Sequence, residues 1–124
     1  MQAIRIHAYG EPEVMRLEES AIPVPQAGQA LVRVQAASVN FLDVQKRRGD
    51  LVGQPFYHRA SGSELPATLG SQGVGVVEAL GPEVSSVVVG ERVSFVGESY
   101  ASHVVVPTAR LIRIPQGVTF EQAA

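Results

Sequence analysis

Gly70-Ser71-Gln72-Gly73-Val74-Gly75-Val76-Val77-Glu78 is the most glycine-dense stretch of the 124-residue chain and decides between two fold classes. A dinucleotide-binding loop needs the spacing Gly-x-Gly-x-x-Gly at the opening of a helix. Here Glu78 stands in the place of the third glycine, and the apolar residues continue as a strand would. A Walker loop would need Gly-Lys-Ser/Thr, which the sequence lacks. The stretch therefore predicts a β-strand whose glycines allow close backbone packing or bulges.

Short apolar runs with a period of two lie on both sides of this strand. Together they predict strands at Ile4–Ala8, Val14–Glu18, Leu31–Ala37, Gly73–Leu80, Arg92–Val96, Tyr100–Val106 and Leu111–Ile114. In the third of these, Val32, Val34 and Ala36 are expected to share one face. Glycine and proline turns separate the runs, which favours a mainly β barrel or sandwich with one or two short helices over a βαβ sheet.

The alternation stops between Asn40 and Arg48, where the sequence predicts one short helix. Asn40 is a typical N-cap, Asp43 falls in the first turn, and Gly49 follows the basic end. The run Lys46-Arg47-Arg48 is interpreted as complementing the helix dipole, with phosphate anchoring as the alternative. From the residues alone, Asn40 and Asp43 are equally explained as capping residues or as site residues. The next segment, 50–66, has no sustained period and predicts a long surface loop.

A second helix is predicted at the end of the sequence, where Thr119 and Gln122 form the Thr-x-x-Gln pattern of a capping box and Ala123-Ala124 follow. Fewer than two helical turns are unstable alone in water, because nucleation is costly. We therefore expect the chain to be a piece of a longer polypeptide.

Composition excludes several classes of partner. The net charge is -2, and the pI near 5.9 offers no positive field for nucleic acid or anionic lipid. Cysteine is absent, and His7, His58 and His103 stand singly, so we expect no metal site. The first ten residues lack the apolar run of a signal peptide, and no apolar stretch approaches the ~18 residues of a membrane span. The expected location is the cytoplasm.

Several segments, in order, resemble the quinone oxidoreductase and zeta-crystallin-like branch of the medium-chain dehydrogenase/reductase superfamily. They are Ala36-Ala37-Ser38-Val39-Asn40-Phe41-Leu42-Asp43, Arg47-Arg48-Gly49, Gly73–Gly81, Val89-Gly90-Glu91-Arg92-Val93, Tyr100-Ala101, Val105-Val106-Pro107 and Phe120–Ala124. The resemblance implies that residues 1–124 form a GroES-like, partly open β-barrel, the catalytic and substrate-side domain of the enzyme. A Rossmann domain that grips NADPH would lie outside this chain.

Zinc-dependent relatives carry Gly-His-Glu where this chain has Gly70-Ser71-Gln72, so the resemblance implies an enzyme without zinc. The full-length protein would be a homodimer that transfers hydride to a quinone or an α,β-unsaturated carbonyl, and the isolated fragment would be inactive. Hydrogen bonds would then polarise the substrate carbonyl in place of a metal.

The resemblance also suggests site residues. Asn40 would be an amide donor near substrate or cofactor, and Asp43 would bond to the nicotinamide end or a neighbouring water. Many relatives have a tyrosine two residues after this aspartate, where this chain has Gln45. Tyr57, in the long loop, is the substitute candidate for a catalytic tyrosine, although a packing role is the more common explanation for a loop tyrosine.

Two other functions remain open at this point. A GroES-like module could bind or scaffold without catalysis, and the downstream reading frame would distinguish it from an enzyme. A zinc alcohol dehydrogenase domain is disfavoured by the missing ligands, and stoichiometric metal in purified protein would restore it. The substrate and the choice of NADPH over NADH depend mostly on residues outside this sequence.

Overall fold

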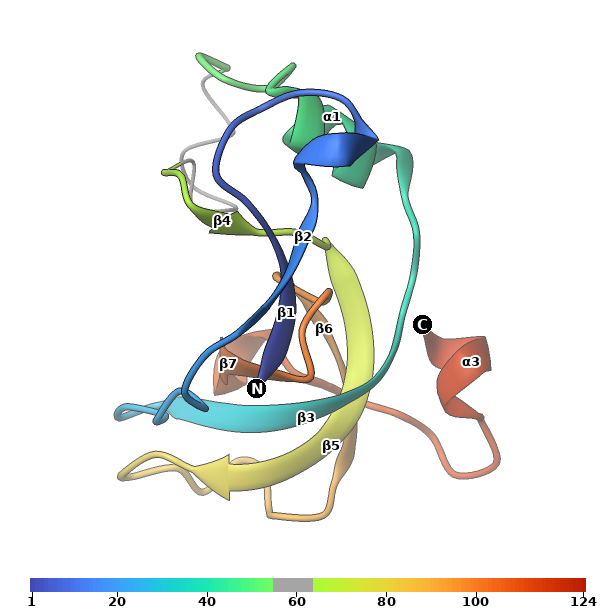
Figure 1. The fold of residues 1–124 in the computed structure, drawn as a ribbon. Helices are drawn as coiled ribbons and strands as arrows, with labels where there is room; N and C mark the ends of the chain where they lie inside the picture. The colour runs from blue at the N-terminus through green and yellow to red at the C-terminus, as the bar shows by residue number, and fades with distance from the viewer. Residues whose placement is uncertain (55–63) are drawn as a thin grey trace.

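A computed structural model describes residues 1–54 and 64–124 as two antiparallel sheets with short helices (Figure 1). The smaller sheet has the order β2-β1-β4, the larger the order β7-β3-β5-β6-β8, and neither closes on itself within the described residues. The strands are β1 (Gln2–Ile6), β2 (Arg16–Glu19), β3 (Gln29–Ala37), β4 (Ala67–Thr68), β5 (Gln72–Leu80), β6 (Arg92–Val96), β7 (His103–Pro107) and β8 (Ile112–Arg113). The helical elements are η1 (Pro12–Val14), α1 (Phe41–Arg48), η2 (Thr108–Arg110) and α3 (Phe120–Ala123). This is the mainly β, partly open architecture that the sequence predicts.

The glycine-dense stretch forms β5, a long and strongly curved strand at the centre of the larger sheet (Figure 1). A β-carbon at Gly73 would lie 2.7 Å from the Phe95 ring, and one at Gly75 would lie 2.2 Å from the Arg33 carbonyl oxygen. Real β-carbons do not approach other atoms so closely, so only glycine fits at these positions. The predicted close backbone packing is confirmed.

The burial of β3 follows the predicted alternation from Val32 to Ala36. Val32 is buried, Val34 and Ala36 are half-buried, and the intervening Arg33 and Gln35 are exposed. The pairing of β3 with β5 nevertheless shifts register between Leu31 and Val32 and again between Val34 and Ala36. Such a bulge adds a residue to one strand, which a pattern of apolar residues does not reveal.

The main core lies on one face of the larger sheet. Its buried members are all hydrophobic and come from β3, β5, β6, β7 and the turn before β6: Ala30, Val32, Val77, Val87, Val93, Phe95, Val104 and Val106. Burial of each large apolar side chain contributes about 1.5 to 3 kcal/mol. This core holds the ends of β3 and β5, from which the site described below extends.

The two predicted helices are present. Helix α1 has Asn40 as its N-cap. Near the C-terminal end of the chain, Thr119 caps α3, and its hydroxyl oxygen accepts the backbone N–H of Gln122 at 3.1 Å. The Arg92 guanidinium lies 4.6 Å from the centre of the Phe120 ring and holds α3 against β6. No helix in the described ranges is long and apolar enough to cross a bilayer.

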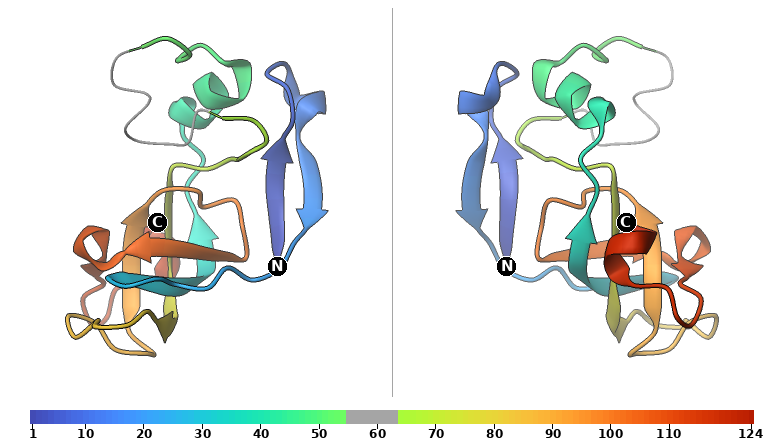
Figure 2. Two further views of the ribbon diagram at one scale, coloured as in Figure 1. Left: turned by 90° about the vertical axis from the view of Figure 1, so that its left-hand side faces the viewer. Right: turned by 90° about the vertical axis from the view of Figure 1, so that its right-hand side faces the viewer.

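Two loops from different parts of the chain meet beneath α1. The backbone N–H of Tyr100 donates to the Leu69 carbonyl at 3.1 Å, and that of Gly97 donates to the Ser71 carbonyl at 3.0 Å. Gly70, at φ +100°, packs so tightly that a β-carbon there would lie 2.6 Å from the Tyr100 nitrogen. Figure 2 shows the β1–β2 hairpin standing beside the larger sheet, with α1 beyond the end of that sheet. We call 69–71 and 97–100 the paired loops.

Candidate active site

The N-terminus of α1 is the centre of the candidate site. The Asp43 Oδ2 accepts the backbone N–H of Asn40 at 2.9 Å, and the backbone N–H of Asp43 donates to the Asn40 carbonyl at 3.0 Å. At the other end, Gly49 adopts the left-handed conformation at φ 81° and ends the helix. The predicted cap, first-turn acid and C-terminal glycine are therefore confirmed as the local cause of this helix.

The Asn40 side chain reaches from the helix to the paired loops. Its Nδ2 donates to the Ser71 Oγ at 3.2 Å, and Ser71 is only 5% exposed, whereas Asn40 is half-buried. An amide nitrogen carries two hydrogens, and a serine hydroxyl that accepts one bond keeps its own hydrogen to donate. The pair therefore offers hydrogen-bond donors at the edge of a buried site.

Asp43 is 5% exposed and is held from a second direction by Tyr100. The Tyr100 hydroxyl donates to Asp43 Oδ2 at 2.9 Å and lies 3.5 Å from the Ser38 carbonyl oxygen. Burial, followed by the hydrogen bond to Asp43 and the charge of that carboxylate, raises the pKa of Tyr100 to about 12. Tyr100 therefore remains a hydrogen-bond donor throughout the physiological pH range.

The basic run lies in the last turn of α1, where cations complement the helix dipole, and the structure adds a second role for one of them. Lys46 is 8% exposed, and its Nζ donates to the Gly70 carbonyl at 2.9 Å. Desolvation lowers the pKa of Lys46, and the charges of Asp43 and Glu98 oppose this shift. Arg47 is also 8% exposed, so of the three cations only Arg48 extends into solvent, where it lies 3.6 Å from Glu11. Side-chain length allows a lysine at a buried position to reach a carbonyl, which the sequence pattern does not show.

Buried polar atoms without a partner are concentrated here. In the described part of the chain they are Ser38 Oγ, Asp43 Oδ1, Ser99 Oγ and Arg5 Nε. The first three lie close to the candidate site: the Ser38 carbonyl lies near the Tyr100 hydroxyl, Asp43 bonds to Tyr100, and Ser99 precedes Tyr100 in the chain. Most buried polar groups in proteins are paired with protein atoms or with ordered water, so these three atoms are positions where a water molecule is expected to bind.

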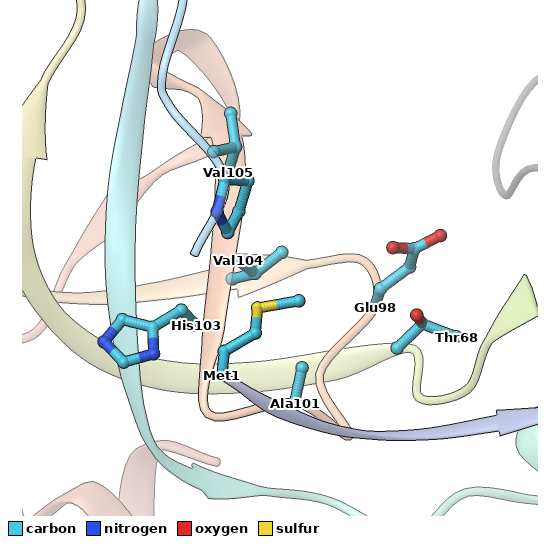
Figure 3. A pocket seen from close by; sticks show the side chains of 8 residues that line it. Met1, Thr68, Glu98, Ala101, His103, Val104 and Val105 are labelled. Carbon is cyan, nitrogen blue, oxygen red and sulfur yellow. The ribbon is translucent and has the colours of Figure 1, made fainter. Parts of the chain in front are cut away.

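Two hollows adjoin these residues. One, of about 380 Å³, is lined mainly by apolar side chains of η1, α1 and the paired loops, together with Asp43, Arg47 and Tyr100. The other, of about 220 Å³, lies between β7 and the start of β1 (Figure 3). Figure 3 shows Glu98 and Thr68 on one side of it and His103 on the other. His103 is already engaged, with its Nε2 3.1 Å from Glu78 and its Nδ1 3.1 Å from the Ser102 hydroxyl.

The donor set beneath α1 does not match a zinc site. Zinc in proteins is held by thiolates, imidazoles and carboxylates. Here the side chains that meet are the Asn40 amide and the Ser71 hydroxyl, while Asp43 Oδ2 is occupied by Asn40 and Tyr100. Across the described ranges, no three histidine, cysteine or acidic side chains gather as metal ligands would.

The structure brings together two of the three site residues suggested by the sequence. Asn40 and Asp43 lie side by side, but Tyr57 falls outside the described residues. Sequence reasoning missed Tyr100 and Lys46 as members of the site. Tyr100 lies 57 residues from Asp43 in the chain, and no local spacing indicates their contact.

Residues 26–116 match the alcohol dehydrogenase GroES-like domain. The match covers most of the chain, and the chain belongs to this family. In sequence the chain is similar to quinone oxidoreductases, which are members of the medium-chain dehydrogenase/reductase superfamily.

The relatives agree with this placement. The chain is 36% identical over 128 residues to a quinone oxidoreductase of Sus scrofa, covering 100% of this chain and 36% of that protein. It is 36% identical over 124 residues to a quinone oxidoreductase of Pseudomonas aeruginosa, covering 98% and 35%. The quinone oxidoreductase of Escherichia coli, solved in complex with NADPH, superposes with a TM-score of 0.85 at 27% identity, covering 99% and 36%. The chain thus spans about a third of the length of these proteins.

Proposed function

We propose that this chain is the substrate-side domain of an NADPH-dependent oxidoreductase that reduces quinones or α,β-unsaturated carbonyls without zinc. The observation that carries the proposal is the Asn40 amide, held half-buried at the N-terminus of α1 by the hydroxyl of Ser71. The similarity to quinone oxidoreductases supports the reaction class, and the NADPH complex of one of them supports the cofactor.

Reduction of a carbonyl or enone by hydride develops negative charge on the substrate oxygen. A bound NADPH would supply the hydride, and a proton from solvent would complete the reduction. The second hydrogen of Asn40 Nδ2 is free of its bond to Ser71 and would donate to the developing oxyanion. The N-terminus of α1 adds the positive end of a helix dipole at the same place. Hydrogen bonds would thus stabilise the charge that zinc stabilises in zinc-dependent relatives.

The remaining expectations about the site stay predictions. Asp43 as a partner for the nicotinamide end and Tyr57 as a catalytic tyrosine belong to this proposal, as do the separate Rossmann domain, the homodimer, the cytoplasmic location and the inactivity of residues 1–124 alone. The buried setting of Asp43 and its two bonds at Oδ2 support a role in holding the site together as well.

The natural full-length product of the gene provides the test. It should oxidise NADPH in the presence of a quinone or an enone, whereas residues 1–124 alone should not. Asn40→Ala should lower kcat by roughly 100-fold, the usual cost of removing one oxyanion donor. Asp43→Ala, assayed beside it, should reduce turnover or cofactor affinity as well.

Two outcomes would overturn the proposal. Stoichiometric zinc in the purified protein, measured by atomic absorption, would favour a zinc alcohol dehydrogenase. Absence of NADPH oxidation with every quinone and enone tested would favour a non-enzymatic GroES-like module.

A further inference from the structure

Tyr100 is joined to Asn40 through a shared carboxylate oxygen. Asp43 Oδ2 accepts the Tyr100 hydroxyl at 2.9 Å and the Asn40 backbone N–H at 2.9 Å. Tyr100 comes from the paired loops and Asn40 caps α1, so this single oxygen connects two separate pieces of the fold. Both bonds are made to a group that is only 5% exposed, where hydrogen bonds to charged acceptors are strong.

The same loops hold the far end of the Asn40 side chain. Ser71, which accepts the Asn40 amide, lies in the loop whose carbonyls accept the backbone N–H groups of Tyr100 and Gly97. Asn40 is therefore fixed at its backbone through Asp43 and Tyr100, and at its side chain through Ser71. Both anchors lead to the paired loops, which backbone hydrogen bonds hold to each other.

We propose that Tyr100 is a positioning residue for the reaction: through Asp43, its hydroxyl fixes the backbone of Asn40 and so aims the Asn40 amide at the substrate oxygen. This inference rests on the proposed function of Asn40. In this proposal Tyr100 acts through Asp43, and not by direct contact with substrate or cofactor. Loss of its hydroxyl leaves the amide present but free to tilt, which weakens an interaction that depends on precise geometry.

The kinetic test is a double-mutant cycle in the full-length enzyme. Tyr100→Phe should lower kcat about 10-fold while the KM for NADPH changes less than about twofold. In the background of Asn40→Ala, the same substitution should have no further effect on kcat, because the group that Tyr100 aims is gone. Equal effects of Tyr100→Phe in both backgrounds would overturn the proposal and leave Tyr100 a structural residue.

Tyr9→Phe is the matched control. The Tyr9 ring lies against Gly49 at the C-terminal end of α1, away from Asn40, since a β-carbon at Gly49 would lie 2.8 Å from that ring. The substitution removes the same chemical group as Tyr100→Phe, a tyrosine hydroxyl, from outside the candidate site, so kcat should not change. A fall in kcat as large as that of Tyr100→Phe would show that the effect is not specific to the Tyr100–Asp43 bond and would overturn the proposal.

A second measurement does not depend on activity. Asn40 is the only asparagine in the chain, so selective ¹⁵N-asparagine labelling of residues 1–124 gives one backbone and one side-chain amide signal. Tyr100→Phe should shift both signals, and Tyr9→Phe should shift neither. If Tyr100→Phe does not fold, Asp43→Ser breaks the same link from the acceptor side and should produce the same shifts.

The two hypotheses fail in different ways. An inactive wild-type enzyme whose labelled amides still respond to Tyr100→Phe would reject the proposed function and retain the link between the residues. An active enzyme whose Asn40 signals and kcat ignore Tyr100→Phe would reject the positioning role alone.

Discussion

Arg113 bonds to Glu91 at the edge of the larger sheet: its Nε donates to Glu91 Oε2 at 2.6 Å. Its Nη2 donates to the Ser86 carbonyl at 2.7 Å. Glu91 in turn accepts the backbone N–H of Val88 at 2.9 Å. The Arg113 hydrogen bond lowers the pKa of Glu91, assisted by the bond from Val88. The arrangement joins β8 to the turn that precedes β6.

Arg113→Met should raise the pKa of Glu91 toward its ordinary value. Because the folded-state pKa is depressed, the contribution of this pair to stability is present above the ordinary carboxyl pKa and is lost as the pH falls through the folded-state value. A carboxyl ¹³C NMR titration measures the shift, with Arg110→Met as a control on a nearby cation outside the pair. A Glu91 midpoint that does not move in Arg113→Met would contradict the prediction.

Gly75→Ala should destabilise the fold by about 2 to 3 kcal/mol, because the new methyl group collides with the Arg33 carbonyl in the middle of the sheet. Gly90→Ala is the matched control: Gly90 has φ +93°, but no atom lies within 4 Å of the added carbon. Its cost should be only about 1 kcal/mol, from backbone strain alone. Urea denaturation of both variants checks the difference, and equal costs would argue against the collision.

Tyr100 should ionise with a midpoint of about 12 in the folded protein. The tyrosinate absorbance should therefore contain a component at this pH that Tyr100→Phe removes and Tyr9→Phe retains. Asp43→Asn should move the midpoint downward, because the carboxylate charge and its hydrogen bond both oppose ionisation. The raised pKa also implies that the stabilisation by Tyr100 is complete below pH ~10 and is lost as the pH rises toward ~12. A Tyr100 midpoint that Asp43→Asn does not change would show that Asp43 does not raise the pKa of Tyr100.

Lys46→Met should flatten the alkaline dependence of stability. Desolvation lowers the folded-state pKa of Lys46, so the unfolded chain binds the proton more tightly. The free energy of unfolding should consequently rise with pH between the folded-state pKa and about 10.5, and fall as the pH drops through that window. Denaturation curves for wild type and Lys46→Met at several alkaline pH values check this. If the free energy of unfolding depended on pH in the same way in wild type and Lys46→Met, the pKa of Lys46 would be the same in the folded and unfolded states.

Local rules were sufficient for the elements that depend on neighbours in sequence. The capping pattern of Asn40 and Asp43 predicted α1, and the Thr-x-x-Gln pattern predicted α3, because each cap is satisfied within one turn. The glycines of β5 were predicted to permit close packing, although the sequence did not indicate which backbone would approach them. In each case the physical cause lies within a few residues.

The rest required the folded chain. The contact of Tyr100 with Asp43 and the bond of Lys46 to Gly70 join residues that are far apart in sequence. The short strand β4 and the bulges of β3 arise from pairing partners and not from apolar periodicity. The resemblance to a family supplied Asn40 and Asp43 as candidate site residues. The geometry adds that Asp43 holds the backbone of Asn40 and that the Asn40 side chain reaches Ser71.

The paired loops are held in place by their backbone and not by the side chains of the candidate site. Their register depends on backbone hydrogen bonds and on the lack of a β-carbon at Gly70, neither of which involves the groups that would meet a substrate. Ser71 could therefore be exchanged for another donor, or for a metal ligand, without redesigning the main chain. The same logic would allow a member of this fold family to gain or lose a metal ligand by point substitution.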